Sequence, residues 1–195
     1  SIFGLGQDVA IPTAFRPPLY PILLAGSMIG DEISPWQVGT LHLLLGLLTI
    51  LLVYQLAQQY GLSRGAPLAA LLVAVDPILL YQSTRIMTET LATLLAVASL
   101  YALSRLNQKH HWTTALISGG ILGLSILCRP TFLVWLLLCL LALVILEPKS
   151  RQRWQLASAL LAGAVLVISP WTIRNMIQFQ RPIALTTHGG YTLLL

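Results

Sequence analysis

The segment from Val38 to Ala57 contains twenty consecutive residues without a charged side chain. An α-helix needs about 20 predominantly apolar residues to cross the hydrocarbon core of a bilayer. The rest of the chain has the same character, because only 9% of its 195 residues are charged and 56% are hydrophobic, whereas a soluble domain has roughly 25% charged residues. We therefore expect an integral membrane protein, and we exclude a disordered tail, a collagen, a coiled coil and an ordinary cytosolic enzyme.

Five further apolar segments follow the first, and two pairs of them lie so close together that each pair needs a break. Residues 113–146 would reach about 51 Å as one helix, far more than a hydrocarbon core of about 30 Å. Proline cannot continue a helix but suits the first turn of the next, so Arg129-Pro130 is the expected break there. The polar run Gln82–Arg85 is the expected hairpin between the other pair.

The expected fold is therefore all-α, a polytopic helical bundle that crosses the membrane six times. The expected spans are residues 38–57, 66–82, 86–103, 113–128, 131–146 and 155–171. Residues 1–35, rich in proline, are expected to form a loop on one side of the membrane, and residues 172–195 are expected to begin a further loop on that same side. Neither end of the chain has the character of a terminus, so we interpret it as a fragment of a longer protein.

The charges separate by side once the spans are drawn. The loops 58–65, 104–112 and 147–154 contain six basic residues and one acid, a net charge of +5. The opposite side has five arginines (Arg16, Arg85, Arg129, Arg174 and Arg181) and five acids, a net charge of zero. Because short basic loops stay in the cytoplasm, residues 1–35 and 172–195 are expected to be extracytoplasmic. No basic run is interleaved with aromatic residues as a nucleic-acid partner would require, so we expect no nucleic acid.

The extracytoplasmic side is also where chemistry is expected. Ionisable groups at the membrane edge are costly and are functional candidates; here they include Asp76, and Glu89, which can pair with Arg85 if the same helix includes both. The alternative is that each arginine reaches lipid headgroups and each acid is a local partner. Five arginines without a lysine favour phosphate, since the planar guanidinium matches phosphate geometry. The residues thus suggest a site for a lipid-linked phosphate beside a carboxylate that acts as a base or holds a divalent cation.

Several motifs occur in an order that resembles a known family. They are TAFRPPLYPILLA (13–25), DPILLYQSTRIMTETL (76–91), GGILGLSILCRPTFL (119–133) and SPWTIRNMIQFQRPIALTTHGGYTLLL (169–195). The chain resembles GT-C membrane glycosyltransferases, and within them the bacterial branch similar to dolichyl-phosphate-mannose protein mannosyltransferases (glycosyltransferase family 39). The resemblance implies an enzyme of the cell (inner) membrane that moves a sugar from a polyprenyl-phosphate carrier to a protein, lipid or glycan acceptor.

The resemblance also implies roles for individual residues. Arg16 would face the carrier phosphate, and Glu89 would be the supporting acid of an outer loop. The remaining residues expected to bind substrate are Tyr20, Arg85, Arg129 and Arg174. A divalent metal ion is an open question: His188 occupies a loop where related enzymes supply a ligand, although a lone loop histidine is more often simply exposed.

The chain departs from the family pattern in two places. The family's catalytic aspartate precedes the Arg-Pro-Pro motif by many residues, so we expect it upstream of Ser1 and expect this fragment alone to be inactive. Phe15 stands where aminoarabinose transferases have an acid, which argues against a metal site of that kind. The alternative function is a membrane transporter or lipid flippase, but uncharged span centres and the lack of an internal repeat favour the transferase.

Overall fold

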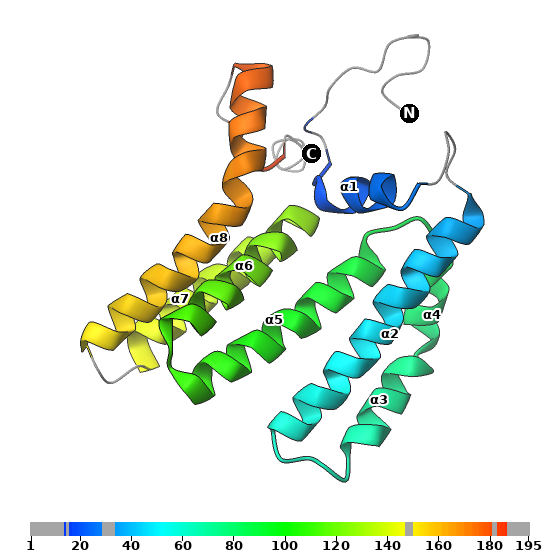
Figure 1. The fold of residues 1–195 in the computed structure, drawn as a ribbon, viewed down its shortest axis with the longest axis horizontal. Coiled ribbons are helices and arrows are strands. Elements are labelled where there is room, and N and C mark those ends of the chain that lie inside the picture. Colours follow the sequence, from blue (N-terminus) through cyan, green and yellow to red (C-terminus); the bar gives the residue numbers. More distant parts are fainter. Residues whose placement is uncertain (1–13, 15, 29–33, 147–149, 181–182, 187–195) are drawn as a thin grey trace, which may run out of the picture.

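Helices account for nearly all of the structure. A computed structural model describes residues 14, 16–28, 34–146, 150–180 and 183–186. These residues contain no strand, which confirms the expected all-α fold (Figure 1). The helices are α1 (Leu19–Gly26), α2 (Pro35–Gln59), α3 (Ala66–Ala74), α4 (Pro77–Ser83), α5 (Glu89–Lys109), α6 (Trp112–Cys128), α7 (Phe132–Leu146) and α8 (Ser150–Phe179).

The six expected spans correspond to helices of unequal length. By length and composition, α2, α5 and α8 can each cross a membrane, and the bent pair α3–α4 would be a fourth if it counts as one span. The helices α6 and α7 are apolar but shorter. The breaks predicted at Arg129-Pro130 and at Gln82–Arg85 are confirmed, because α6 ends at Cys128 and α4 ends at Ser83. The count of six crossings stays a prediction.

The segment 66–82, expected to be one helix, is divided in two. The axes of α3 and α4 differ by 50° at the break. At that break the carboxylate of Asp76 accepts hydrogen bonds from the backbone amides of Ile78 and Leu79, at 2.9 Å each, and Pro77 occupies the first position of α4. An aspartate followed by proline is a strong helix start. Asp76, expected as a functional candidate, is therefore seen to cap α4.

Helix α8 continues beyond Trp171, where we expected the span to end, and reaches Phe179. Pro170 lies inside it and cannot donate the usual hydrogen bond to the carbonyl four residues earlier, which belongs to Leu166. The hydroxyl of Ser169 donates to that carbonyl instead, at 3.2 Å. This replacement lets the helix pass through the proline, so residues 172–179 are helical.

Helices α6 and α8 pack with their backbones almost in contact. A Cβ atom added to Gly119 would lie 1.9 Å from the carbonyl oxygen of Leu160, and one added to Gly163 would lie 2.1 Å from that of Leu116. Small residues at such spacing allow membrane helices to approach closely. The apolar cluster around this contact includes Leu122, Ile126 and other residues of α6 to α8 (Leu136, Leu156, Leu160, Ala164). The pair is therefore the most tightly packed part of the bundle.

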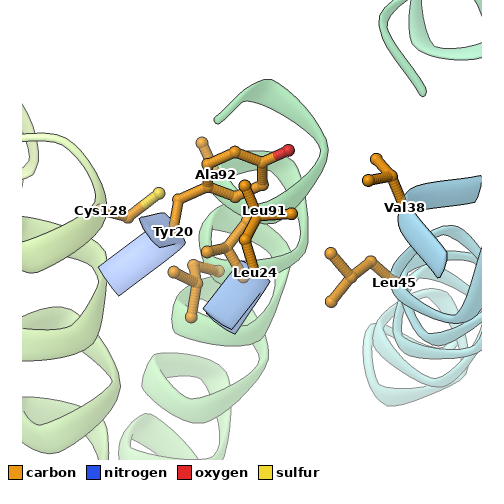
Figure 2. Packing of buried hydrophobic residues seen from close by; sticks show 8 residues of the cluster. Tyr20, Leu24, Val38, Leu45, Leu91, Ala92 and Cys128 are labelled. Carbon is orange, nitrogen blue, oxygen red and sulfur yellow. The ribbon is translucent and has the colours of Figure 1, made fainter. Parts of the chain in front are cut away.

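The short helix α1 lies across one end of the bundle, near the start of α2 and the end of α6 (Figure 1). Its Tyr20 and Leu24 are buried against Leu91 and Ala92 of α5 and against Cys128 of α6 (Figure 2). The α4–α5 and α6–α7 connections reach the same end, which is the side where the sequence predicted the chemistry.

Candidate functional site

A cavity of about 680 Å³ lies at the end of the bundle that α1 covers. It is formed by α1 and the residues before it, the start of α5 and the connection that precedes it, the α6–α7 break, and Thr186. Four of the residues predicted to form the site line this cavity, namely Arg16, Tyr20, Glu89 and Arg129. Residues separated by more than a hundred positions in the sequence thus come together in one place.

Arg129 and Glu89 form an ion pair across the cavity wall. The Nη2 atom of Arg129 lies 3.4 Å from Oε1 of Glu89, and the side chains are 46% and 18% exposed. The second carboxylate oxygen, Oε2, is buried and has no hydrogen-bond partner among the described residues. The ion pair holds the guanidinium of Arg129 beside the cavity, while about half of the surface of the Arg129 side chain stays accessible. The predicted partner of Glu89 was Arg85, but α5 begins at Glu89, so Arg85 lies outside that helix.

Tyr20 connects the cavity to the interior of the bundle. Its hydroxyl lies 2.9 Å from Nε2 of His42, a buried residue of α2. Nδ1 of the same ring lies 2.7 Å from the carbonyl oxygen of Ser83. Burial raises the pKa of Tyr20, and the negative charge of Glu89 raises it further, against a smaller opposing effect of a hydrogen bond with the backbone of Met87. Tyr20 therefore stays protonated, and its hydroxyl can donate a hydrogen bond to His42.

Arg16 is exposed on the α1 side of the cavity. Among the residues that the structure describes, Arg16 forms no ion pair; the ion pair found there joins Arg129 and Glu89. The cavity is thus bordered by one arginine before α1 and a second at the α6–α7 break. Both carry charge at any physiological pH, since arginine is not deprotonated in proteins.

The other two predicted arginines are held outside this cavity. Arg85 donates a hydrogen bond to the hydroxyl of Tyr81, and its guanidinium carbon lies 4.7 Å from the centre of that ring. Arg174 lies 4.8 Å from the centre of the Trp171 ring and donates to the side-chain oxygen of Asn175 at 3.0 Å. Cation–π contacts of this kind are favourable, and here they orient each arginine toward an aromatic residue three or four positions earlier in the chain.

Sequence reasoning missed two polar residues that organise this end of the bundle. One is His42. The other is Asn175, fully buried in α8, whose amide donates to the carbonyls of Ile183 and Leu185 at 3.3 and 3.5 Å. The ring nitrogen of Trp171 also donates to Leu185, at 2.7 Å. These bonds fold the chain after α8 back toward the cavity. The motif that contains Asn175 was recognised, whereas a single histidine in an apolar span gives no indication of its partners.

The described residues offer no set of metal ligands. They contain no group of three or more His, Cys, Asp or Glu side chains that could hold an ion. Glu89 contributes a carboxylate to the cavity, and one of its oxygens is already committed to Arg129. His188, the residue considered as a metal ligand, lies outside the described residues, as do the acids Asp8, Asp31 and Glu32.

Two arginines and one carboxylate at the rim of a membrane bundle form a site suited to an anionic group such as phosphate. The model of the dolichyl-phosphate-mannose-protein mannosyltransferase family matches residues 15–173. The chain belongs to this family and is a membrane glycosyltransferase of the GT-C type. This membership favours the transferase over the transporter or flippase alternative. No curated protein and no solved structure matched the chain at the required significance.

Proposed function

We propose that the protein moves a sugar from a polyprenyl-phosphate carrier to a protein, lipid or glycan acceptor on the extracytoplasmic face of the cell (inner) membrane. Family membership supports the transferase chemistry. The observation that carries the rest is the cavity that Arg16 and Arg129 share at the end of the bundle. Its rim position suits a donor whose isoprenoid tail stays in the bilayer while its phosphate reaches the membrane surface.

In this proposal the two arginines bind the carrier phosphate. The acceptor oxygen attacks C1 of the sugar, the bond between C1 and the phosphate oxygen breaks, and the phosphate leaves with the electron pair. The acceptor proton passes to a base. We do not assign that base to Glu89, because its carboxylate is paired with Arg129 and so orients the guanidinium. Fixed positive charge beside a leaving phosphate stabilises the transition state, which is usually the largest catalytic contribution.

Arg85 and Arg174 have no place in this phosphate site. Each is bonded to, or packed on, residues of its own neighbourhood and neither lines the cavity. Tyr20 lines the cavity, and its hydroxyl bonds to His42. We therefore assign the phosphate to Arg16 and Arg129 and assign Tyr20 to the wall that supports them.

The test is a transfer assay of the intact protein in membranes with a polyprenyl-phosphate sugar as donor. Loss of one charged hydrogen bond costs about 1.5–3 kcal/mol, so Arg16→Ala and Arg129→Ala should each lower kcat/KM for the donor by about tenfold to a hundredfold. Polyprenyl phosphate should compete with the donor in the wild type, and the polyprenol without phosphate should compete far less. Both arginine variants should lose that difference.

Arg105→Ala is the matched control. Arg105 is an exposed arginine of α5 that packs on Tyr101 of its own helix, and it lies in the last part of that helix, away from the cavity. Its replacement should leave the donor KM unchanged. If donor affinity and turnover are the same in Arg16→Ala, Arg129→Ala and the wild type, the arginines do not bind the phosphate and the proposed site is wrong.

A further inference from the structure

His42 is a buried ionisable residue in a helix that is long and apolar enough to cross a membrane. Only 1% of its surface is exposed, and α2 contains no Asp, Glu, Lys or Arg. Polar groups in such a setting are costly and are usually kept for a purpose. The transfer mechanism does not use His42, so its role must come from its contacts.

Those contacts have a defined direction. The carbonyl oxygen of Ser83 can only accept, so Nδ1 of His42 carries the proton and donates to it. In the neutral ring Nε2 is then an acceptor, and the hydroxyl of Tyr20 donates to it at 2.9 Å. One imidazole thus links three elements: α1 through Tyr20, α2 through its own backbone, and the end of α4 through Ser83. No atom of this link is left without a partner.

Helix α1 has little else of a polar kind to hold it. It has eight residues, and no side chain caps its first turn, so it is too short to be stable alone in water. Among the described residues, the bond from Tyr20 to His42 is the one side-chain hydrogen bond between α1 and another helix. The remaining support is a hydrogen bond between Tyr20 and the backbone of Met87, in the connection before α5, and apolar packing of Tyr20 and Leu24 on α5 and α6 (Figure 2). Apolar packing is non-directional, so these polar contacts of Tyr20 fix the orientation of α1.

The position of α1 decides the shape of the cavity. Arg16 precedes α1 by three residues, whereas Glu89 and Arg129 belong to α5 and the α6–α7 break. A shift of α1 would therefore move one arginine relative to the other. The connection that leads from Ser83 to Glu89 supplies Ile86, Met87 and Thr88 to the cavity wall, and its first carbonyl is the one that His42 binds.

We propose that His42 is a positioning residue of the transferase: through Tyr20 it fixes α1, and through Ser83 it fixes the connection that precedes Glu89, so that Arg16 faces Arg129 across the cavity. The effect on the donor rests on the proposed function, while the effect on α1 does not. The structural and the functional consequence can therefore be measured separately.

The structural consequence is tested by hydrogen exchange of the α1 amides, followed by mass spectrometry of the intact protein in detergent. His42→Asn should speed exchange in α1 by about threefold to tenfold, the size expected for one net hydrogen bond of about 0.5–1.5 kcal/mol. Tyr20→Phe should speed it at least as much, because it also removes the hydrogen bond with the backbone of Met87. The double variant should exchange no faster than Tyr20→Phe alone, because Tyr20→Phe already removes the contact with His42. Exchange in the tightly packed α6–α8 pair should stay unchanged.

Two amide variants separate the Tyr20 contact from general damage to α2. The shorter amide in His42→Asn can still reach the position of Nδ1 and bind Ser83, but it cannot reach Tyr20. The longer amide in His42→Gln places an acceptor near the position of Nε2, so it should restore most of the α1 protection. Thr49→Val is the matched control: Thr49 is buried in the same helix, and its hydroxyl bonds only to Leu45 of that helix.

The functional consequence is a several-fold rise of the donor KM in Tyr20→Phe and His42→Asn, with no change in Thr49→Val. His42→Gln should recover part of the donor KM, because it regains the contact with Tyr20 but not the bond to Ser83. Unchanged α1 exchange in His42→Asn would overturn the proposal outright. It would also be overturned if α1 loosens and Arg16→Ala weakens donor binding, yet His42→Asn leaves the donor KM unaltered. If α1 loosens and Arg16→Ala has no effect on the donor, the positioning of α1 is supported and the proposed phosphate site fails.

Discussion

The two carboxylate oxygens of Glu89 have unlike surroundings. Oε1 faces Arg129, whereas Oε2 is buried without a hydrogen-bond partner among the described residues. Removing Arg129 would leave a mostly buried negative charge with no counter-ion, which is unfavourable in a region of low dielectric. The cost is reduced because Arg129 is about half exposed, and water screens such a pair.

We therefore expect Arg129→Ala to lower the free energy of unfolding by about 1 kcal/mol or less, and the double variant Arg129→Ala with Glu89→Gln to recover part of that loss. The neutral amide no longer requires a counter-ion, which is the reason for the recovery. Both effects are measured by thermal unfolding in detergent, with the exposure of buried thiols as the signal. A double variant that is less stable than Arg129→Ala would show that Glu89 is stabilised by something other than this ion pair.

Single residues also show what the sequence could and could not predict. Arg16, Tyr20, Glu89 and Arg129 were expected on one side of the membrane, and the structure gathers them around one cavity. Arg85 and Arg174 share that end but pack on Tyr81 and Trp171, four and three residues earlier. That spacing is visible in the sequence and indicates that each arginine has an aromatic partner nearby. The partners of His42 were not predictable, because Tyr20 and Ser83 meet it only through the fold.

Helices differ in how clearly the sequence marks their ends. The α6–α7 break at Arg129-Pro130 was predicted, since a charged residue and a proline interrupt an apolar run there. The α3–α4 break was not, because the apolar run continues on both sides of Asp76 and the cap depends on local hydrogen bonds. The extension of α8 was hidden for a related reason: Pro170 normally limits a helix, but the hydroxyl of Ser169 bonds to the carbonyl that the proline cannot reach.

The contact between α6 and α8 gives a test at the scale of helices. Alanine is normally preferred over glycine inside a helix by about 1 kcal/mol, but a Cβ at position 163 would lie 2.1 Å from the carbonyl oxygen of Leu116. We expect Gly163→Ala to destabilise the protein by about 1–3 kcal/mol through overpacking, measured by thermal unfolding in detergent. Gly46→Ala in α2 is the control, because nothing lies within 4 Å of its added Cβ and stability should be equal or higher. Equal stability of the two variants would mean that α6 and α8 are not in backbone contact.

At the scale of the whole molecule, the sorting of charge by side is the argument for orientation. The chain has a net charge of +5, and six predicted crossings place all of it in three loops on one side. In the structure the α4–α5 connection, the α6–α7 break and the end of α8 lie toward α1, and the α2–α3 and α5–α6 connections lie at the opposite end (Figure 1). The helix order therefore agrees with alternate crossings, while the short α6 and α7 and the bent α3–α4 pair are the elements on which the count depends.

Accessibility of single cysteines to a membrane-impermeant thiol reagent tests each crossing in turn. In a background without Cys128 and Cys139, cysteine is placed at exposed positions in or beside successive connections: Ser63, Thr84, Lys109, Thr131, Arg151 and Gln180. Six crossings predict that Thr84, Thr131 and Gln180 react from the extracytoplasmic side, and that Ser63, Lys109 and Arg151 react only after the membrane is opened. Reaction of Ser63 and Thr84 from the same side would make α3–α4 a re-entrant hairpin. Reaction of Thr131 and Arg151 from the same side would remove α7 from the spans. It would also put the basic residues at the start of α8 on the side of the cavity, against the sorting of charge that predicts the orientation.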